Sequence, residues 1–358
     1  MHSARIKRVV ERLKAERIDA LLVTYIPNVQ YLSGFTGSTA MLLITQDKRY
    51  FLTDFRYLEQ VKQQCDPGYK LVDNTNKKLM QDILPTLPGS AGLKRIGFES
   101  RQMSHATWER FKTPKREFVA TEGWIEELRA VKTPAEVELI RAAIRVNEQV
   151  FTEMLHQIGP KTTEADLAAE MVYRAIKHGA QERSFTPIIA SGDNAAKPHA
   201  EFTSRTLVKG APLTIDMGVL LNGYCSDMTR TVFYWDCPPE WERVYGIVRE
   251  AKERAQAAIK PGAVGRDVHR VALGHITAAG YGDYFNHGLG HGVGIEVHEG
   301  PALAMAGEAA LKPGNVVTVE PGIYLPGKGG VRIEDIVLVT KTGYQNLNVL
   351  PTDLMVVG

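Results

Sequence analysis

The segment His287–Glu299, with the sequence HGLGHGVGIEVHE, is the strongest constraint on how this chain can fold. Glycine occupies every second position from 288 to 294. Glycine weakens helices and strands because it loses more conformational freedom on folding than other residues do. Glycines at this density therefore predict a backbone that passes close to another group. The three histidines, His287, His291 and His298, suggest that this group is a metal ion or a substrate.

The composition is that of a globular protein large enough for two domains. The chain has 358 residues, of which 44% are hydrophobic and 23% charged, and its formal net charge is +2. This charge gives no strong field for nucleic acid or for an anionic membrane, so we expect neither as a partner. The three cysteines have no metal-ligand spacing, and the N-terminus has no signal-peptide pattern. We therefore expect a cytoplasmic protein.

Apolar and amphipathic segments alternate along the first part of the chain. An amphipathic pattern from Arg5 to about Arg17 predicts a helix, and DALLVTY, AMLLIT and RYFLTD after it predict strands. The alternation continues through RYLEQVKQQC, YKLVD, LMQDILPTL, RIGFE, HATWERFK and EFVAT. Strands and helices in turn predict an α/β layered domain over residues 1–125.

A capping box marks the start of a second domain. Thr133 is followed by a proline and, three residues on, by Glu136, which predicts the start of a long helix. We place the second domain at residues 126–358. Within it, IGPKTTEADL from Ile158 and IKPGAVGRDV from Ile259 match at an offset of about 101 residues. This internal repeat predicts a duplicated domain.

Two aspartates lie in a predicted hairpin. In LTIDMGVLLNGYCSDMTRTVFYW, apolar runs flank Asn222-Gly223, and both residues suit the positive φ angles of a two-residue turn. Counting back from the turn places Thr229 opposite Asp216. Asp227 then lies on the same face as Asp216, and Gly218 clears space between the two carboxylates. Like charges this close stay ionised only with a cation between them, or else one binds a proton.

The second copy contributes two glutamates in apolar strands. Glu320 lies in NVVTVEPGIYL and Glu334 in GVRIEDIVLVT. An ionised carboxylate in such surroundings must be paired or neutralised. With His291, the four carboxylates form an oxygen-rich set that suits Mn²⁺, Co²⁺ or Zn²⁺, and two divalent ions would balance their charge. His269 and His275 lie on a predicted helix, where we expect ordinary structural residues.

These residues and their flanks resemble the proline-specific branch of the pita-bread metallopeptidases, which includes aminopeptidase P and Xaa-Pro dipeptidase (prolidase). GYCSDMTRT, HGLGHGVGIEVHE, VEPGIY and GVRIED carry the resemblance, and NVQYLSGFTGS and TDFRY resemble the family's creatinase-like N-terminal domain. The resemblance implies an α/β (α+β) chain with a creatinase-like N-terminal α/β domain and a duplicated pita-bread metallopeptidase domain. It also implies two divalent metal ions per chain, Mn²⁺ first, a homodimer, and proline-containing peptides as substrates.

The resemblance assigns roles to ten residues. Five would ligate the two ions: Asp227 and Glu334 as bridges, Asp216 on one ion, and His291 and Glu320 on the other. Glu320 would also carry a proton to the leaving nitrogen after an activated water attacks the scissile carbonyl. His199 and His298 would hydrogen-bond the substrate as catalytic groups, and His287 would line the proline pocket. Arg332 and Tyr324 would hold the ligand carboxylates in place.

One departure from the family's pattern bears on the length of the substrate. Dipeptidases of the family often carry an arginine shortly after the second motif histidine, where it could pair with the free carboxylate of a dipeptide. Here that position is about Ala302, and no lysine or arginine occurs between His298 and Lys312. We therefore predict an aminopeptidase P that acts on longer peptides. Prolidase is the alternative, because a cation could come from the N-terminal domain or from a partner subunit.

Three other classes fit the sequence less well. A methionine aminopeptidase would share the five ligands but not the N-terminal domain. Creatinase shares both domains but works without the metal pair. A peptidase-like binding module without catalysis typically lacks the ligands that this chain retains.

Overall fold

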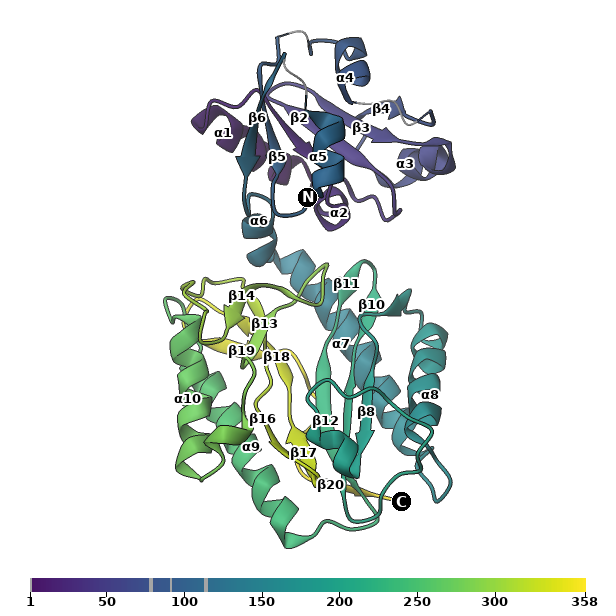
Figure 1. Ribbon diagram of the computed structural model, residues 1–358, viewed down its shortest axis with the longest axis vertical. Coiled ribbons are helices and arrows are strands. Elements are labelled where there is room, and N and C mark those ends of the chain that lie inside the picture. Colours follow the sequence, from purple (N-terminus) through teal and green to yellow (C-terminus); the bar gives the residue numbers. More distant parts are fainter. Residues whose placement is uncertain (1, 77–79, 91, 113–114) are drawn as a thin grey trace. The chain divides into compact units, whose positions relative to one another are not determined.

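The computed structural model describes residues 2–76, 80–90, 92–112 and 115–358. The chain divides into two compact units, Met1–Arg129 and Ala130–Gly358 (Figure 1). In the described part of the chain, no helix combines the length and the apolar character needed to cross a membrane.

The first unit is built on one mixed sheet with the strand order β4-β3-β2-β1-β5-β6. β2 pairs antiparallel with both β1 and β3, whereas the other neighbouring strands pair in parallel, so β2 alone runs against the rest of this sheet. Its strands are β1 (Ala20–Val23), β2 (Met41–Thr45), β3 (Arg49–Thr53), β4 (Lys70–Asp73), β5 (Arg95–Glu99) and β6 (Glu117–Thr121). The helices are α1 (His2–Ala15), α2 (Ile26–Ser33), α3 (Leu58–Gln64), α4 (Met80–Ile83), α5 (His105–Phe111) and α6 (Glu126–Ala130).

The predicted alternation of the first unit is present, with two additional helices, α2 and α6, among the described residues. The sequence did not indicate α2, because Tyr25 at its N-cap offers no side-chain hydrogen bond and the helix has only eight residues. The helix ends at Gly34, whose φ of 84° stops it. The predicted segment LMQDILPTL begins at Leu79, outside the described residues, and its described part contains α4.

The second unit is a pair of similar halves. α7 (Pro134–Leu155) and α8 (Glu164–Lys177) belong to the first half, and α9 (Pro239–Ala258) and α10 (Gly265–Ala278) to the second. In Figure 1 the two helix pairs flank the sheets from opposite sides. The α7 helix starts at the predicted capping box, in which Thr133 and Glu136 each accept the other's backbone N–H. α8 and α10 begin 101 positions apart, which matches the offset of the sequence repeat.

Each half contributes a main sheet. The first has the order β20-β12-β9-β8 and the second the order β14-β13-β15-β18-β19, with smaller sheets β11-β10-β7 and β16-β17. The strands of the first half are β7 (Glu182–Arg183), β8 (Ile188–Ser191), β9 (Pro212–Met217), β10 (Val219–Leu221), β11 (Tyr224–Cys225) and β12 (Met228–Tyr234). Those that follow are β13 (Gly290–Gly292), β14 (Glu299–Leu303), β15 (Val316–Val319), β16 (Gly322–Leu325), β17 (Gly329–Arg332), β18 (Asp335–Val339), β19 (Tyr344–Asn346) and β20 (Met355–Val357).

Alternation along the strands separates the apolar core from a polar inner face. Ile215 of β9 packs in one cluster with Phe151 of α7 and Met171 of α8. The next residue, Asp216, therefore faces away from these helices. In the second half, Val317 of β15 packs with residues of α9. The next residue, Thr318, therefore points towards the inner face in the same way. Polar residues of both halves thus share the space between the two main sheets.

Candidate active site

The two aspartates lie in the predicted register. Leu221 pairs with Tyr224 across the Asn222-Gly223 turn, whose residues have φ angles of 51° and 77°. The same register places Thr229 of β12 opposite Asp216 of β9. Asp227 lies directly before β12, and both aspartates are buried. The hairpin therefore holds the two carboxylates together on the inner face.

Gly218 was predicted to clear space between the carboxylates of Asp216 and Asp227, and this explanation is wrong. A Cβ atom at this position would lie 2.2 Å from the carbonyl oxygen of Ser226 and 2.9 Å from the ring of Phe185. The glycine is needed because neighbouring protein groups fill the space, not because the carboxylates of Asp216 and Asp227 do.

The same correction applies to the glycine-rich segment. A Cβ on Gly290 would lie 2.1 Å from the carbonyl oxygen of Thr318 in β15, and one on Gly292 would lie 2.2 Å from that of Gly300 in β14. These glycines let β13 lie between two strands at very close range. They hold the strand that carries His291, and Gly288 and Gly290 also line the cavity described below, where the predicted metal or substrate would lie.

The second half brings two glutamates to the same place. Glu320 directly follows β15, and Glu334 lies between β17 and β18 with 1% of its surface exposed. The hydroxyl of Thr229 donates to Oε2 of Glu334 at 2.7 Å, and the N–H of Glu334 donates to the carbonyl of Thr229 at 3.1 Å. Thr229 thus ties the two halves together beside the carboxylates. This role of Thr229 was not predicted, although its position opposite Asp216 was a signal.

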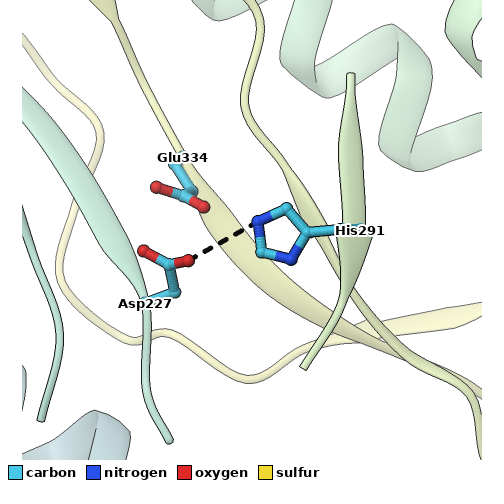
Figure 2. Close-up of side chains that lie close together, drawn as sticks. All are labelled: Asp227, His291 and Glu334. Carbon is cyan, nitrogen blue, oxygen red and sulfur yellow. Dashed lines mark ion pairs between the residues drawn. The ribbon is translucent and has the colours of Figure 1, made fainter. Parts of the chain in front are cut away.

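The imidazole of His291 also faces these carboxylates. Its Nε2 lies 3.6 Å from Oδ2 of Asp227 and 3.3 Å from Oε1 of Glu320. Asp227, His291 and Glu334 each offer a ligand atom, and these atoms all lie within 4.8 Å of one another. Figure 2 shows the three side chains pointing towards a common space from separate segments of the chain.

The electrostatics of this cluster fit a divalent cation. Burial, followed by the charges of the neighbouring carboxylates, raises the pKa of Asp227 and of Glu334 well above the usual range. Oδ1 of Asp216 and Oε1 of Glu334 are buried and accept no hydrogen bond from the described residues. Buried carboxylate oxygens without donors are costly unless a cation binds them. Carboxylates with one imidazole form a ligand set that Mn²⁺, Co²⁺ and Zn²⁺ accept.

Arg332 and Tyr324 lie beside the carboxylates, and Nη2 of Arg332 donates to Oδ2 of Asp216. Nη1 of Arg332 donates to the Tyr324 hydroxyl at 2.7 Å, and its Nε donates to the hydroxyl of Thr229 at 3.1 Å. The Tyr324 hydroxyl also lies 3.0 Å from Nε2 of His287. A continuous set of hydrogen bonds therefore connects the proposed proline pocket to the acidic cluster.

A cavity of about 650 Å³ opens onto these groups. All ten predicted site residues line it: His199, Asp216, Asp227, His287, His291, His298, Glu320, Tyr324, Arg332 and Glu334. The ring centre of His298 lies 4.3 Å from that of His291. The apolar part of the wall was not predicted, and it includes Phe185, Ile188 and Phe202. These residues carry no motif, so only their position reveals them.

The two histidines expected to be structural lie outside the cavity. His269 and His275 are on α10, and His269 is buried beside the ring of Phe285. Neither lines the cavity.

Comparison with known proteins agrees with this site. The family model described as metallopeptidase family M24 matches residues 138–341, and that of the creatinase/prolidase N-terminal domain matches residues 5–131. The chain belongs to metallopeptidase family M24. It is therefore a metal-dependent peptidase, and the family membership implies divalent metal ions.

Relatives cover the chain over nearly its full length. The Xaa-Pro dipeptidase of Pyrococcus horikoshii is 33% identical and aligns with 98% of this chain and 98% of its own length. The structure of an Xaa-Pro dipeptidase from Bacillus anthracis matches with a TM-score of 0.95 at 35% identity, and all of both chains is covered. That of an X-Pro aminopeptidase from Thermotoga maritima gives 0.90 at 36% identity and covers 98% of this chain and 99% of the other. The predicted family and the predicted fold are confirmed.

Proposed function

We propose that this M24 peptidase hydrolyses Xaa-Pro dipeptides, which makes it an Xaa-Pro dipeptidase. The observation that supports the chemistry is the convergence of buried carboxylates and His291 in one cavity. The dipeptide substrate is supported by the relatives, since the Pyrococcus horikoshii protein and the Bacillus anthracis structure both carry this name. The order of the two predicted activities is therefore reversed, and aminopeptidase P becomes the second candidate.

Two divalent ions, Mn²⁺ first, would be held by the acidic cluster. We assign Asp227 and Glu334 as the shared ligands, Asp216 to one ion, and His291 with Glu320 to the other. Bound ions of this kind lower the pKa of a water and stabilise negative charge on a carbonyl oxygen.

The remaining chemistry belongs to the chain's own groups. Glu320 lies at the cavity wall, accepts a hydrogen bond from the Thr318 hydroxyl at 3.1 Å, and would move a proton to the leaving nitrogen of proline. Burial lowers the pKa of His298. An imidazole with a lowered pKa is neutral near pH 7 and can donate one hydrogen bond to the substrate. His199 would hydrogen-bond the substrate from the other half, and His287 would contact the proline ring.

One observation favours the second candidate, an Xaa-Pro aminopeptidase for longer peptides. Among the described residues that line the cavity, Arg332 is the only lysine or arginine, and its hydrogen bonds go to protein groups. The described cavity-lining residues therefore offer no cationic side chain that could pair with the free carboxylate of a dipeptide. A longer peptide presents a neutral amide at that position. Ala302, the position considered for an arginine, lies exposed on β14 and does not line the cavity.

A comparison of substrate lengths tests the proposal. The value of kcat/KM is measured for an Xaa-Pro dipeptide and for the matching Xaa-Pro-Yaa tripeptide, with the same Mn²⁺ concentration and pH. We expect the dipeptide to be preferred, and an Xaa-Ala dipeptide to be cleaved poorly. A preference for the tripeptide of about tenfold or more, or 1.4 kcal/mol, would favour the aminopeptidase. Equal cleavage of Xaa-Ala would contradict both candidates.

Two further expectations remain proposals. We propose a homodimer, which sedimentation velocity of the purified chain can test. We also propose that the protein acts in the cytoplasm, which fractionation of cells that express it can test.

A further inference from the structure

His199 reaches the cavity from a loop that its own side chain does not anchor. The loop runs from Gly192 to Phe202, between Ser191 at the end of β8 and Thr203. The imidazole of His199 is exposed, and its ring forms no hydrogen bond with the described residues. The place of the ring at the cavity therefore depends on how the loop backbone is held.

The carboxylate of Glu164 joins the two ends of this loop. Its Oε1 accepts the backbone N–H of Ser191 at 2.7 Å. Its Oε2 accepts both the N–H of Thr203 at 2.8 Å and the Thr203 hydroxyl at 2.7 Å. Glu164 is 1% exposed and is the first residue of α8. One buried carboxylate thus closes the base of the loop.

A second hydrogen-bonded link extends from Glu164 across the loop. Nδ2 of Asn194 donates to Oε2 of Glu164 at 3.0 Å and to the carbonyl of Glu201 at 3.0 Å. Glu201 lies two residues after His199 and lines the cavity. The carboxylate is therefore connected to the cavity side of the loop as well as to its base.

Every hydrogen-bond partner of the Glu164 carboxylate is a donor. Its donors are backbone N–H, hydroxyl and amide groups, all of which need an acceptor, and the start of α8 adds a favourable dipole. The helix start itself does not depend on Glu164, because Thr163 and Asp166 form the capping box. A glutamine at 164 would direct an NH₂ group towards donors, so the loop base would lose at least one of its hydrogen bonds.

We propose that Glu164 is a positioning residue for the substrate, acting through His199 by closing the base of the Gly192–Phe202 loop. The part of this inference that concerns substrate rests on the proposed function of the site. The part that concerns the loop does not, so the two can fail separately.

The test compares Glu164→Gln with the parent and with Asp166→Asn. The control removes a carboxylate from the same helix start without touching the loop. Amide hydrogen exchange is followed by mass spectrometry in peptides that cover 191–203 and 293–303. We expect exchange in the first segment to rise about tenfold or more in Glu164→Gln alone, with the second segment and the metal content unchanged. Unchanged exchange in 191–203 would overturn the proposal.

A double-variant cycle separates positioning from a general loss of stability. Alone, Glu164→Gln should lower kcat/KM for the Xaa-Pro dipeptide on the order of 10- to 100-fold, since a displaced group loses its alignment. In a His199→Ala background the further loss should be below about twofold, because the group that Glu164 positions is already absent. Full multiplication of the two losses would overturn the proposal.

A milder variant covers the case in which Glu164→Gln does not fold. Thr203→Val keeps the branched shape but removes one donor to the carboxylate, and it should raise exchange in 191–203 and lower kcat/KM in the same direction by a smaller factor. No change in exchange would overturn the loop-closing role. If the parent itself does not cleave Xaa-Pro peptides, the proposed function fails, while the exchange measurement still decides whether Glu164 holds the loop.

Discussion

Nη2 of Arg332 donates a hydrogen bond to Oδ2 of Asp216 across 2.6 Å, and Oδ1 of the same carboxylate stays buried without a hydrogen-bond donor among the described residues. The arginine orients the carboxylate, and the second oxygen is free to bind a cation. The same guanidinium bonds Tyr324 and Thr229, which lie on different strands. One side chain thereby fixes the geometry of a proposed metal ligand.

Replacing Arg332 by lysine should therefore weaken metal binding. A lysine ammonium cannot reproduce the planar set of donors that reaches three groups at once. We expect affinity for Mn²⁺ to fall about 10- to 100-fold, as is typical when a partner of a metal ligand is lost. Isothermal titration of the metal-free protein measures this, with Arg254→Lys, which is exposed, as the control. Equal affinities in Arg332→Lys and the parent would show that Asp216 needs no such support.

The acidic cluster predicts how pH affects the metal-free protein. Burial and neighbouring carboxylates raise the pKa values of Asp227 and Glu334 above their ordinary values of 3.8 and 4.5. The folded state then holds these protons more tightly than the unfolded chain, so this stabilisation is complete below those values and is lost as pH rises above them. We expect Tm of the metal-free protein to fall as pH rises above these ordinary values.

Added Mn²⁺ should reverse this trend. Metal ions compete with protons for the carboxylates, so the increase in Tm caused by Mn²⁺ should grow over the same pH range. Differential scanning fluorimetry of the parent and of Asp227→Asn/Glu334→Gln measures both effects, and the variant should show a smaller pH slope. A parent slope equal to that of the variant would remove these two residues as its cause.

His298 and His199 should behave differently from the metal ligands. Each lines the cavity, and we propose that each bonds the substrate rather than an ion. His298→Ala and His199→Ala should lower kcat on the order of 100-fold while metal content stays at the parental value. Steady-state kinetics and elemental analysis test this, with the exposed His105→Ala as the control. Loss of metal from either variant would reassign that histidine as a ligand.

Much of this site could be predicted from the order of residues, because local rules fix it. The turn at Asn222-Gly223 has one favoured geometry, and the period of two along a strand then places Asp216 opposite Thr229. Glu320 and Glu334 were singled out because they lie in apolar segments, and the resemblance supplied the role of each ligand. No local rule gives the distance from His291 to Glu320, since it depends on how the two halves pack.

The remaining errors have the same physical origin. The sequence predicted that the backbone at Gly290 and Gly292 passes close to another group. Only the packed sheet shows that the groups next to these glycines are the backbones of β14 and β15. Glu164 carries no motif, and its hydrogen bonds join residues that lie far from it in the sequence. Such roles depend on tertiary packing and cannot be predicted from the periodicity of the sequence.

The ion pair of Lys132 and Glu299 should be important for stability. Nζ and Oε2 lie 3.0 Å apart, and the side chains are 1% and 5% exposed. Lys132→Met leaves a buried charge without this cation, which should cost about 3–5 kcal/mol of unfolding free energy. Urea unfolding measures the loss. The pair Lys132→Met/Glu299→Gln should recover part of it, because no unpaired charge remains. A double variant less stable than Lys132→Met would contradict this account.

The most direct test of the central claim is the metal content and Xaa-Pro dipeptide hydrolysis of Asp227→Asn/Glu334→Gln beside the parent. Both proteins are stripped with a chelator, reloaded with Mn²⁺, and assayed at the same pH. If these residues are the shared ligands, the parent loses its activity on chelation and recovers it with Mn²⁺, while the variant retains neither bound metal nor activity. A variant that hydrolyses the dipeptide at the parental rate would contradict the account.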